Sequence, residues 1–322
     1  MFDPAKIPGM IEPVEQQMLT GLAADRFIAD NGVIVEFGCF FGRSASCLVN
    51  GALAWWSPER GPAVHTFDSF ACDHKGGFGQ YVTGFAKNAG VGHIVRREGS
   101  HIDFRPVYDH FVGPAEAMGV LKTTTAELRN AQRPNAPIAL MHIDAPKFYE
   151  ELRYVLVRFF PALVPDARIV FQDYFYPWSA SLIAGTQLLA ERGILRYERS
   201  AASALLCRIL RVPSLEEIAE IDLAMVDASV TDLIERSIAA MSGVAVDRPE
   251  QFLPRLCLAK MQYLWGLGRF AEADAALMQV LSLTGNTLTA AVFNDFRELL
   301  RYGFNIRRLY EMDHAERGSA AH

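Results

Sequence analysis

The stretch from Val33 to Leu48 constrains the fold of this chain more than any other part of the sequence. An apolar, β-branched run ends at Glu36, and Gly38 and Gly42 follow before a helical pattern rich in small residues begins. This order predicts a buried parallel strand, a tight glycine turn and a helix. Glycine suits such a turn because it adopts backbone angles that a Cβ resists and lets a ligand approach the peptide closely.

The spacing of this turn narrows the class of ligand. A dinucleotide-binding turn has the pattern G-x-G-x-x-G, in which the central glycine lies against the pyrophosphate. Here Phe40 stands at the central position, and the pattern is E-x-G-x-x-x-G-x-S, ending at Ser44. We therefore expect a nucleoside without a pyrophosphate, and a nicotinamide-dependent enzyme comes last among the candidate functions.

A second apolar run, Ala63 to Asp68, also ends in an acid and is followed by Ser69. A carboxylate at the tip of the second strand is suited to accept hydrogen bonds from both ribose hydroxyls. The two features together resemble the class I S-adenosylmethionine-dependent methyltransferases. The resemblance implies S-adenosylmethionine (SAM) as cofactor. The residues expected to bind it are Glu36, Gly38, Gly42, Ser44, Asp68, Ser69 and Thr124.

Strands alternate with helices over residues 1–212, which predicts an α/β domain with a doubly wound, Rossmann-like and mostly parallel sheet. A helix is expected over 9–31, and Thr124 is expected either to cap the next helix or to contact the adenine. We expect a turn over 161–168. The further strands are expected at 119–123, with an alternative at 94–97, and at 138–144 and 169–173.

Residues 71–115 differ in character from the rest of the domain, because they are rich in glycine and aromatic residues. A long irregular segment inside an α/β domain is more often functional than not. We therefore expect a substrate lid beside the ligand cleft, with Phe78 and Tyr81 among its aromatic residues. A disordered insertion is the alternative.

From residue 213 to residue 322 the pattern becomes helical. Residues 258–277 resemble one tetratricopeptide-type hairpin, with Gly268 at the turn. One hairpin is fewer than the three or so repeats that a solenoid needs. We therefore expect its apolar face to pack on the main domain, on neighbouring helices or on a second copy of the chain, so that a homodimer is a candidate assembly.

Composition excludes several classes of protein. The formal net charge is −6 and basic residues form no block, so we expect no nucleic-acid partner. No apolar run approaches the length of a membrane span, and the N-terminus lacks the apolar core of a signal peptide. The five cysteines are scattered without C-x-x-C spacing, which is typical of reduced thiols in a cytoplasmic protein.

Polar residues at the ends of the fourth and fifth expected strands are the candidates for chemistry. Asp144, Gln172 and Asp173 together offer two carboxylates and an amide oxygen, which suit a hard cation such as Mg²⁺. Such a cation lowers the pKa of a bound hydroxyl. Lys147 is a candidate base, and His142 is the alternative, although a histidine on a buried strand is usually structural.

The order of these motifs over residues 30–180 is similar to the macrocin-type sugar O-methyltransferases and to the catechol and caffeoyl-coenzyme A O-methyltransferases. The resemblance implies Asp144, Gln172 and Asp173 as metal ligands, and Lys147, Asp144 and Asp173 as the catalytic set. The chain departs from the macrocin-type pattern in two ways: Pro146 and Gln172 each replace an acid, and Asp166-Ala167 replace the usual Gly-Gly before the last strand.

The expected function is transfer of a methyl group from SAM to a hydroxyl of a sugar or small secondary metabolite, with a divalent cation assisting. One alternative is a metal-independent methyltransferase in which Asp173 or His142 is the base. The other is a non-catalytic binding or assembly protein that keeps the nucleoside fold and uses its C-terminal helices as an interaction surface.

Overall fold

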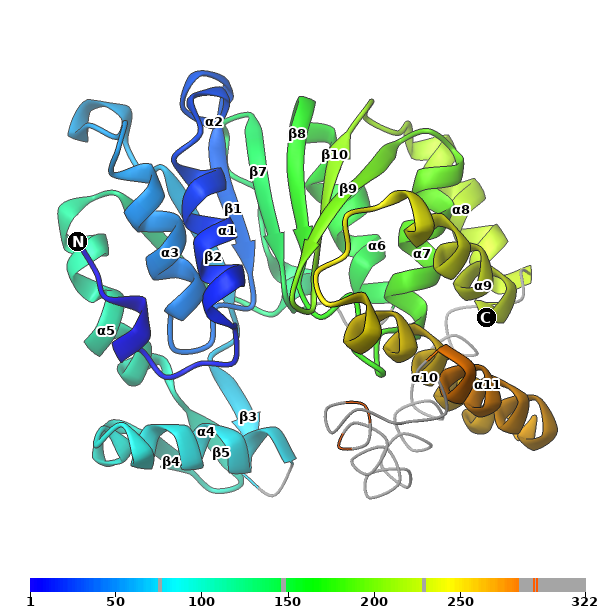
Figure 1. Cartoon of the computed structure of the whole chain (residues 1–322). Coiled ribbons are helices and arrows are strands. Elements are labelled where there is room, and N and C mark those ends of the chain that lie inside the picture. The colour runs from blue at the N-terminus through cyan, green and yellow to red at the C-terminus, as the bar shows by residue number, and fades with distance from the viewer. Residues whose placement is uncertain (75–76, 146–148, 228–229, 284–291, 293, 295–322) are drawn as a thin grey trace, which may run out of the picture.

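The computed structural model describes residues 1–74, 77–145, 149–227, 230–283, 292 and 294. A seven-stranded sheet lies at its centre, in the order β6-β2-β1-β7-β8-β10-β9 (Figure 1). All neighbouring strands pair in parallel except β10, which is antiparallel to both of its neighbours. The strands are β1 Val33–Phe37, β2 Val64–Asp68, β6 Leu121–Thr125, β7 Ile138–Ile143, β8 Leu163–Phe171, β9 Leu195–Ala201 and β10 Ala204–Ile209.

Helices cover both faces of this sheet, which confirms the expected doubly wound architecture (Figure 1). The apolar core on one face is shared with α1 Pro13–Ala23, α2 Arg26–Asn31, α3 Arg43–Ala52 and α5 Arg105–Met118. The core on the other face is shared with α6 Tyr149–Arg158, α7 Ala180–Glu191, α8 Leu215–Asp227 and α9 Val230–Ala240.

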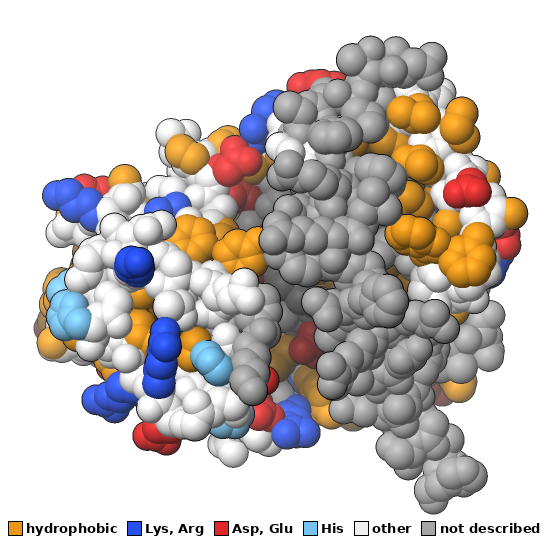
Figure 2. All heavy atoms as spheres, turned by 90° about the horizontal axis from the view of Figure 1, so that it is seen from below, with side chains coloured by type: hydrophobic (Ala, Val, Ile, Leu, Met, Phe, Trp, Pro, Cys, Tyr) orange, Lys and Arg blue, Asp and Glu red, His pale blue; other side chains and the backbone are white. Residues whose placement is uncertain are grey.

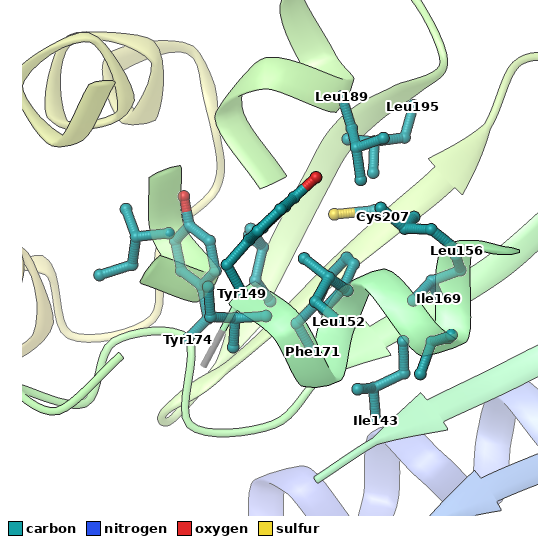
Figure 3. Packing of buried hydrophobic residues seen from close by; sticks show 14 of the residues in the cluster. Ile143, Tyr149, Leu152, Leu156, Ile169, Phe171, Tyr174, Leu189, Leu195 and Cys207 are labelled. Atoms are coloured by element: carbon teal, nitrogen blue, oxygen red, sulfur yellow. The ribbon is translucent and has the colours of Figure 1, made fainter. Parts of the chain in front are cut away.

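Burial on both faces explains why the central strands are apolar along their whole length. Every residue of β7 is buried, and its apolar side chains are divided between the two cores. Figure 3 shows one of these cores, in which Ile143, Ile169 and Cys207 from three neighbouring strands lie near Leu152 of α6 and Leu189 of α7. The packed sheet is thus a fixed platform for the loops at its edge.

Three local expectations were wrong. No α-helix follows β6; Thr124 lies inside the strand, and only one 3₁₀ turn, Leu128–Asn130, precedes β7. The expected turn over 161–168 is mostly strand, because β8 begins at Leu163 and a register irregularity against β7 accommodates the extra residues. The expected helix over 9–31 is two helices, because α1 ends at Ala23 and Asp25 caps α2.

The segment 71–115 is regular, contrary to expectation. It contains β3 Ala71–Asp73, β4 Arg96–Glu98 and β5 His101–Asp103, which form a small antiparallel sheet, and the helix α4 Gly77–Asn88. The third strand of the main sheet is therefore β6, and the alternative at 94–97 belongs to the small sheet. Residues 105–115 are the start of α5, which packs on the main sheet.

The helical pattern after residue 213 is confirmed for the described residues. Helices α8 and α9 share the core of the sheet, so they belong to its covering layer. Helices α10 Pro249–Gly266 and α11 Phe270–Leu283 pack against each other and extend beyond that layer (Figure 1). The likeness of the α10–α11 pair to a tetratricopeptide repeat stays a prediction, and so does the domain boundary at residue 212.

Within the described residues, no helix is both long enough and apolar enough to cross a bilayer.

The contact between α1 and α3 depends on one glycine. A Cβ on Gly51 would lie 2.4 Å from the carbonyl oxygen of Thr20 and 2.6 Å from the Cβ of Ala23. Both distances are shorter than atoms tolerate, so a side chain here would force the helices apart. Gly21 of α1 is exposed, and a Cβ there would meet nothing within 4 Å.

We expect Gly51→Ala to lower the free energy of unfolding by about 1–3 kcal/mol, the usual cost of overpacking. The matched control, Gly21→Ala, should raise it by about 0.5–1 kcal/mol because alanine favours the helix. Urea unfolding followed by circular dichroism measures both. Equal effects of the two substitutions would show that the helices do not need this close approach.

Candidate functional site

The strands β1, β2, β6, β7 and β8 end at one edge of the sheet, and a cleft of about 1180 Å³ lies along it. One half is lined by the glycine turn after β1 and by the ends of β2 and β6. The other is lined by the ends of β7 and β8, by α6 and by the β9–β10 turn. Ligands bind at this edge in open α/β sheets. The volume accommodates a nucleoside cofactor together with a small acceptor.

The glycine turn needs its glycines for reasons internal to the protein. Gly38 has a φ of 79°, and an added Cβ would lie 2.8 Å from the backbone nitrogen of Ala145. Gly42 has a φ of 93° and lies against Val112 of α5. Phe40 also has a positive φ, 50°, which is rare for a bulky residue and typical of functional turns.

Asp68, the last residue of β2, joins this turn to the second strand. Its Oδ2 accepts hydrogen bonds from the backbone nitrogens of Cys39 (2.9 Å) and Phe40 (3.0 Å), and its Oδ1 accepts from the nitrogen of Phe70 (2.8 Å). Burial raises the pKa of Asp68 to about 6, although these three hydrogen bonds favour its charged form. Ser69 follows it and also lines the cleft.

The structure places the predicted cofactor residues at different depths. Gly38, Asp68 and Ser69 line the cleft directly, and Gly42 shapes the turn. Glu36 and Ser44 are buried beneath the lining, and Thr124 pairs beside Phe67 within the sheet. The lining residues after β6 are Ala126, Glu127 and Leu128.

The predicted chemical residues meet in the other half of the cleft. Asp144 after β7 and Gln172 and Asp173 after β8 all line it, because β7 and β8 are parallel neighbours. Asp173 has a φ of 58°, a left-handed conformation that turns the chain sharply after the strand. Lys147 lies outside the described residues.

A buried row of polar side chains runs beneath this half. The Nδ1 of His142 lies 3.1 Å from Glu36 Oε1, and its Nε2 lies 3.4 Å from Gln172 Oε1. Both partners are acceptors, so only a doubly protonated ring satisfies both. Burial lowers the pKa of His142, but the opposing effects of Glu36, Asp144 and Gln172 together outweigh burial and raise it. His142 is therefore a buried hydrogen-bonding partner of Glu36.

The row continues to Glu15 of α1, which sequence reasoning missed. Glu15 Oε1 accepts hydrogen bonds from Gln172 Nε2 (2.8 Å) and Ser203 Oγ (2.9 Å), and Oε2 accepts from the backbone nitrogen of Glu12 (2.6 Å). Burial raises its pKa to about 7. The sequence signal was only a helix-capping pattern, which says nothing of a cleft.

A metal ion does not fit Gln172 as a ligand. The amide oxygen faces His142, and the amide nitrogen, which cannot bind a cation, donates to Glu15 and Ser203. In the described part of the chain, no group of three or more His, Cys, Asp or Glu side chains is arranged to hold a metal. Asp144 and Asp173 remain as the two carboxylates of the predicted set.

The aromatic residues near the cleft differ in their position and in their exposure. Phe78 and Tyr81 of α4 are about half exposed and line the cleft, and the Phe78 ring lies 5.7 Å from that of Phe40. Tyr176 lines the opposite half. Phe175, next to Tyr176 in sequence, is fully buried in the core.

The structure is that of an α/β protein with a cleft at the carboxyl edge of its sheet, and solved structures of O-methyltransferases resemble it. The O-methyltransferase NovP matches with a TM-score of 0.45 and 14% identity, over 63% of this chain and 83% of that one. The TDP-rhamnose 3′-O-methyltransferase CalS11 of calicheamicin biosynthesis matches with a TM-score of 0.38 and 22% identity, over 61% and 80%. An O-methyltransferase from Bacillus cereus in complex with S-adenosylhomocysteine (SAH) matches with a TM-score of 0.39 and 13% identity, over 64% and 86%.

No protein-family model matches the chain, and no curated protein matches it in sequence. The similarity found is thus one of structure, to SAM-dependent O-methyltransferases as a class.

The raised pKa of Glu15 makes stability depend on pH. An unfolded glutamate ionises near pH 4.5, whereas Glu15 in the folded protein keeps its proton to about pH 7. The folded state therefore binds more protons between these values, and its advantage is lost as the pH rises through 7. We expect this group to account for at most about 3 kcal/mol of the fall in unfolding free energy between pH 5 and pH 8.

Urea unfolding at several pH values tests this expectation. Glu15→Gln removes the titration, so its stability should fall less steeply over this range than that of the wild type. Glu59→Gln is the control. The Glu59 side chain is exposed, and its lowered pKa keeps it ionised throughout this pH range. Identical slopes in Glu15→Gln and wild type would contradict the assignment.

Proposed function

We propose that the protein is a SAM-dependent O-methyltransferase that acts on a hydroxyl of a small molecule. The observation that carries the proposal is Asp68, whose carboxylate joins the tip of β2 to the glycine turn at the floor of the cleft. A carboxylate there is suited to the ribose hydroxyls, and Phe40 stands where a dinucleotide-binding turn has its central glycine.

The environment of Glu36 favours a positively charged group of the cofactor beside the turn. Its Oε1 faces His142, whereas its Oε2 is buried with no hydrogen-bond partner. A buried carboxylate oxygen without a donor is costly, so it favours an ammonium group or an ordered water nearby. The α-ammonium group of SAM is such a donor.

SAM supplies a methyl group already activated by its sulfonium. The protein must hold the acceptor oxygen in line with the methyl and sulfur and exclude water. The new O–C bond forms as the S–C bond breaks, and the hydroxyl proton passes to a base. Asp144 and Asp173 are the described candidates for that base, and Lys147 is the third. Helix α4, with Phe78 and Tyr81, is proposed as the lid.

Two versions of this chemistry differ in the need for a cation. A Mg²⁺ ion would rest on Asp144 and Asp173, without Gln172, because the Gln172 amide oxygen faces His142. The same hydrogen bonds favour the metal-independent version, in which Asp173 is the base. His142 is disfavoured as that base because it is buried and paired with Glu36.

Calorimetric titration with SAM and with SAH tests the cofactor assignment. We expect micromolar binding, and we expect Asp68→Ala to weaken it at least tenfold, because two hydrogen bonds to a charged acceptor are lost. Asp30→Ala, at an exposed aspartate of α2, should bind as the wild type does. If neither ligand binds, the methyltransferase proposal fails and a non-catalytic binding or assembly role takes its place.

The cation is tested by repeating the SAH titration with Mg²⁺ and with EDTA, and by titrating Mg²⁺ itself. In the metal-independent version, EDTA leaves SAH affinity unchanged and Mg²⁺ alone gives no binding heat. A binding heat for Mg²⁺ that Asp173→Asn abolishes, and that the surface variant Asp30→Asn retains, would restore the metal-assisted version.

The remaining expectations concern the cellular location and the oligomeric state of the protein. A cytoplasmic location and a homodimer formed through the C-terminal helices stay predictions, the second to be tested by light scattering.

A further inference from the structure

A short segment before α1, residues 7–12, runs along the cleft and is held in place by α3 (the strap). The Nε of Arg43, the first residue of α3, donates to the carbonyl oxygen of Ile7 (2.6 Å), and its Nη1 donates to that of Ile11 (3.3 Å). Both isoleucine side chains are buried in the core that α3 shares. Because it is fastened at two points and packed from within, the strap is a fixed wall of the cleft.

Exposed apolar side chains line the cleft from the strap and from α4. Met10 of the strap is 58% exposed, and Phe78 and Tyr81 of α4 are 45% and 50% exposed. The Phe78 ring is held by the rings of Phe40 and Phe104, at centroid distances of 5.7 and 6.3 Å. Figure 2 views the edge of the molecule on which the cleft opens, with hydrophobic side chains exposed on the side of α4. Two separate elements therefore present apolar side chains to one cleft.

The polarity of the cleft is the reverse of that of an ordinary protein surface. Glu15 and Gln172 line it and are almost fully buried, with exposed fractions of 1% and 3%. Met10 and Phe78 also line it, yet they are exposed. Soluble proteins normally bury large apolar side chains and expose polar ones. Apolar side chains left in water around a polar cleft are typical of a binding site for a ligand with an apolar part.

We propose that Met10, together with Phe78 and Tyr81, selects a methyl acceptor whose hydroxyl is attached to a planar, apolar ring system. This inference rests on the proposed function for the identity of the occupant. The hydroxyl lies toward the carboxylates at the strand tips, Asp144 and Asp173, and the ring lies against the exposed apolar side chains. Met10 is then a specificity-determining residue, carried by a strap that the protein holds in one position.

The types of side chain explain why the ring is planar. A methionine side chain is unbranched and adapts to the shape of its partner, and its sulfur makes favourable contacts with ring edges. Phe78 and Tyr81 offer aromatic rings, which pack in stacked or edge-to-face arrangements on another ring. A free sugar would lose water from its hydroxyl groups against these side chains and would gain no hydrogen bonds from them. The acceptor is therefore an aromatic hydroxyl compound, or a sugar that carries such a ring.

The experiment uses the full chain and two hydroxyl compounds as probes, 2-naphthol and methyl α-glucopyranoside, titrated calorimetrically into free and SAH-saturated protein. We expect 2-naphthol to bind with one-to-one stoichiometry, and about tenfold or more tightly than the glucoside. Met10→Gln keeps the length of the side chain but makes it polar, so it should weaken 2-naphthol binding about fivefold or more. Met10→Leu should retain most of the binding, because it stays apolar.

Two matched variants separate the cleft from other exposed apolar side chains. Met118, at the end of α5, is 49% exposed and lies outside the described lining of the cleft, so Met118→Gln should bind 2-naphthol as the wild type does. Phe78→Ser should weaken the binding about fivefold or more. Phe270→Ser, at an exposed phenylalanine of α11 that is also outside the described lining, should leave it unchanged.

Any of three results overturns the proposal: 2-naphthol binds no more tightly than the glucoside, Met10→Gln binds it as the wild type does, or Met118→Gln weakens it as much as Met10→Gln does. Thermal unfolding of each variant verifies the fold, and Met10→Ser replaces Met10→Gln if the latter unfolds. Met10-dependent binding of 2-naphthol in a protein that binds neither SAM nor SAH would leave the apolar site standing while the proposed function fails. SAH binding without 2-naphthol binding would do the opposite.

Discussion

The hydrogen bonds from Cys39 and Phe40 to Asp68 join the tips of the first two strands where the cleft opens. They hold the glycine turn in its left-handed conformation, and that turn presses Gly38 against the backbone of Ala145 after β7. Three strand tips are thereby fixed relative to one another. Because a charged acceptor stabilises two backbone donors at once, the loss of Asp68 would release the whole floor of the cofactor half.

A second set of buried side chains stabilises the half of the cleft at the ends of β7 and β8. Glu36, His142, Gln172 and Glu15 form a continuous row of hydrogen bonds beneath the sheet edge, with the Oε2 atom of Glu36 left without a hydrogen-bond partner. Hydrogen bonds within this row occupy the Gln172 amide, so it does not serve as a cation ligand. The same hydrogen bonds join α1 to the loop after β8. Buried polar rows of this kind specify one arrangement of their members, since any other leaves a group without a partner.

The cleft is thus built from three parts of the chain. The parallel sheet supplies the glycine turn and the carboxylates at its tips, the segment after β2 supplies the lining residues Phe78 and Tyr81, and α10 supplies Arg255. The cleft therefore combines residues from the ends of the sheet with residues from segments that lie outside the sheet.

The sequence by itself determined the strands β1, β2, β6 and β7, the end of β8, the glycine turn and the presence of Asp68, Asp144 and Asp173 at strand tips, because apolar runs and glycine spacing are local signals. The tertiary structure alone decided that Glu15 and Arg255 line the same cleft, that His142 is engaged by Glu36, and that the segment after β2 is a small sheet. Those facts depend on contacts between residues far apart in the chain, and no local pattern records which distant partner a side chain will meet.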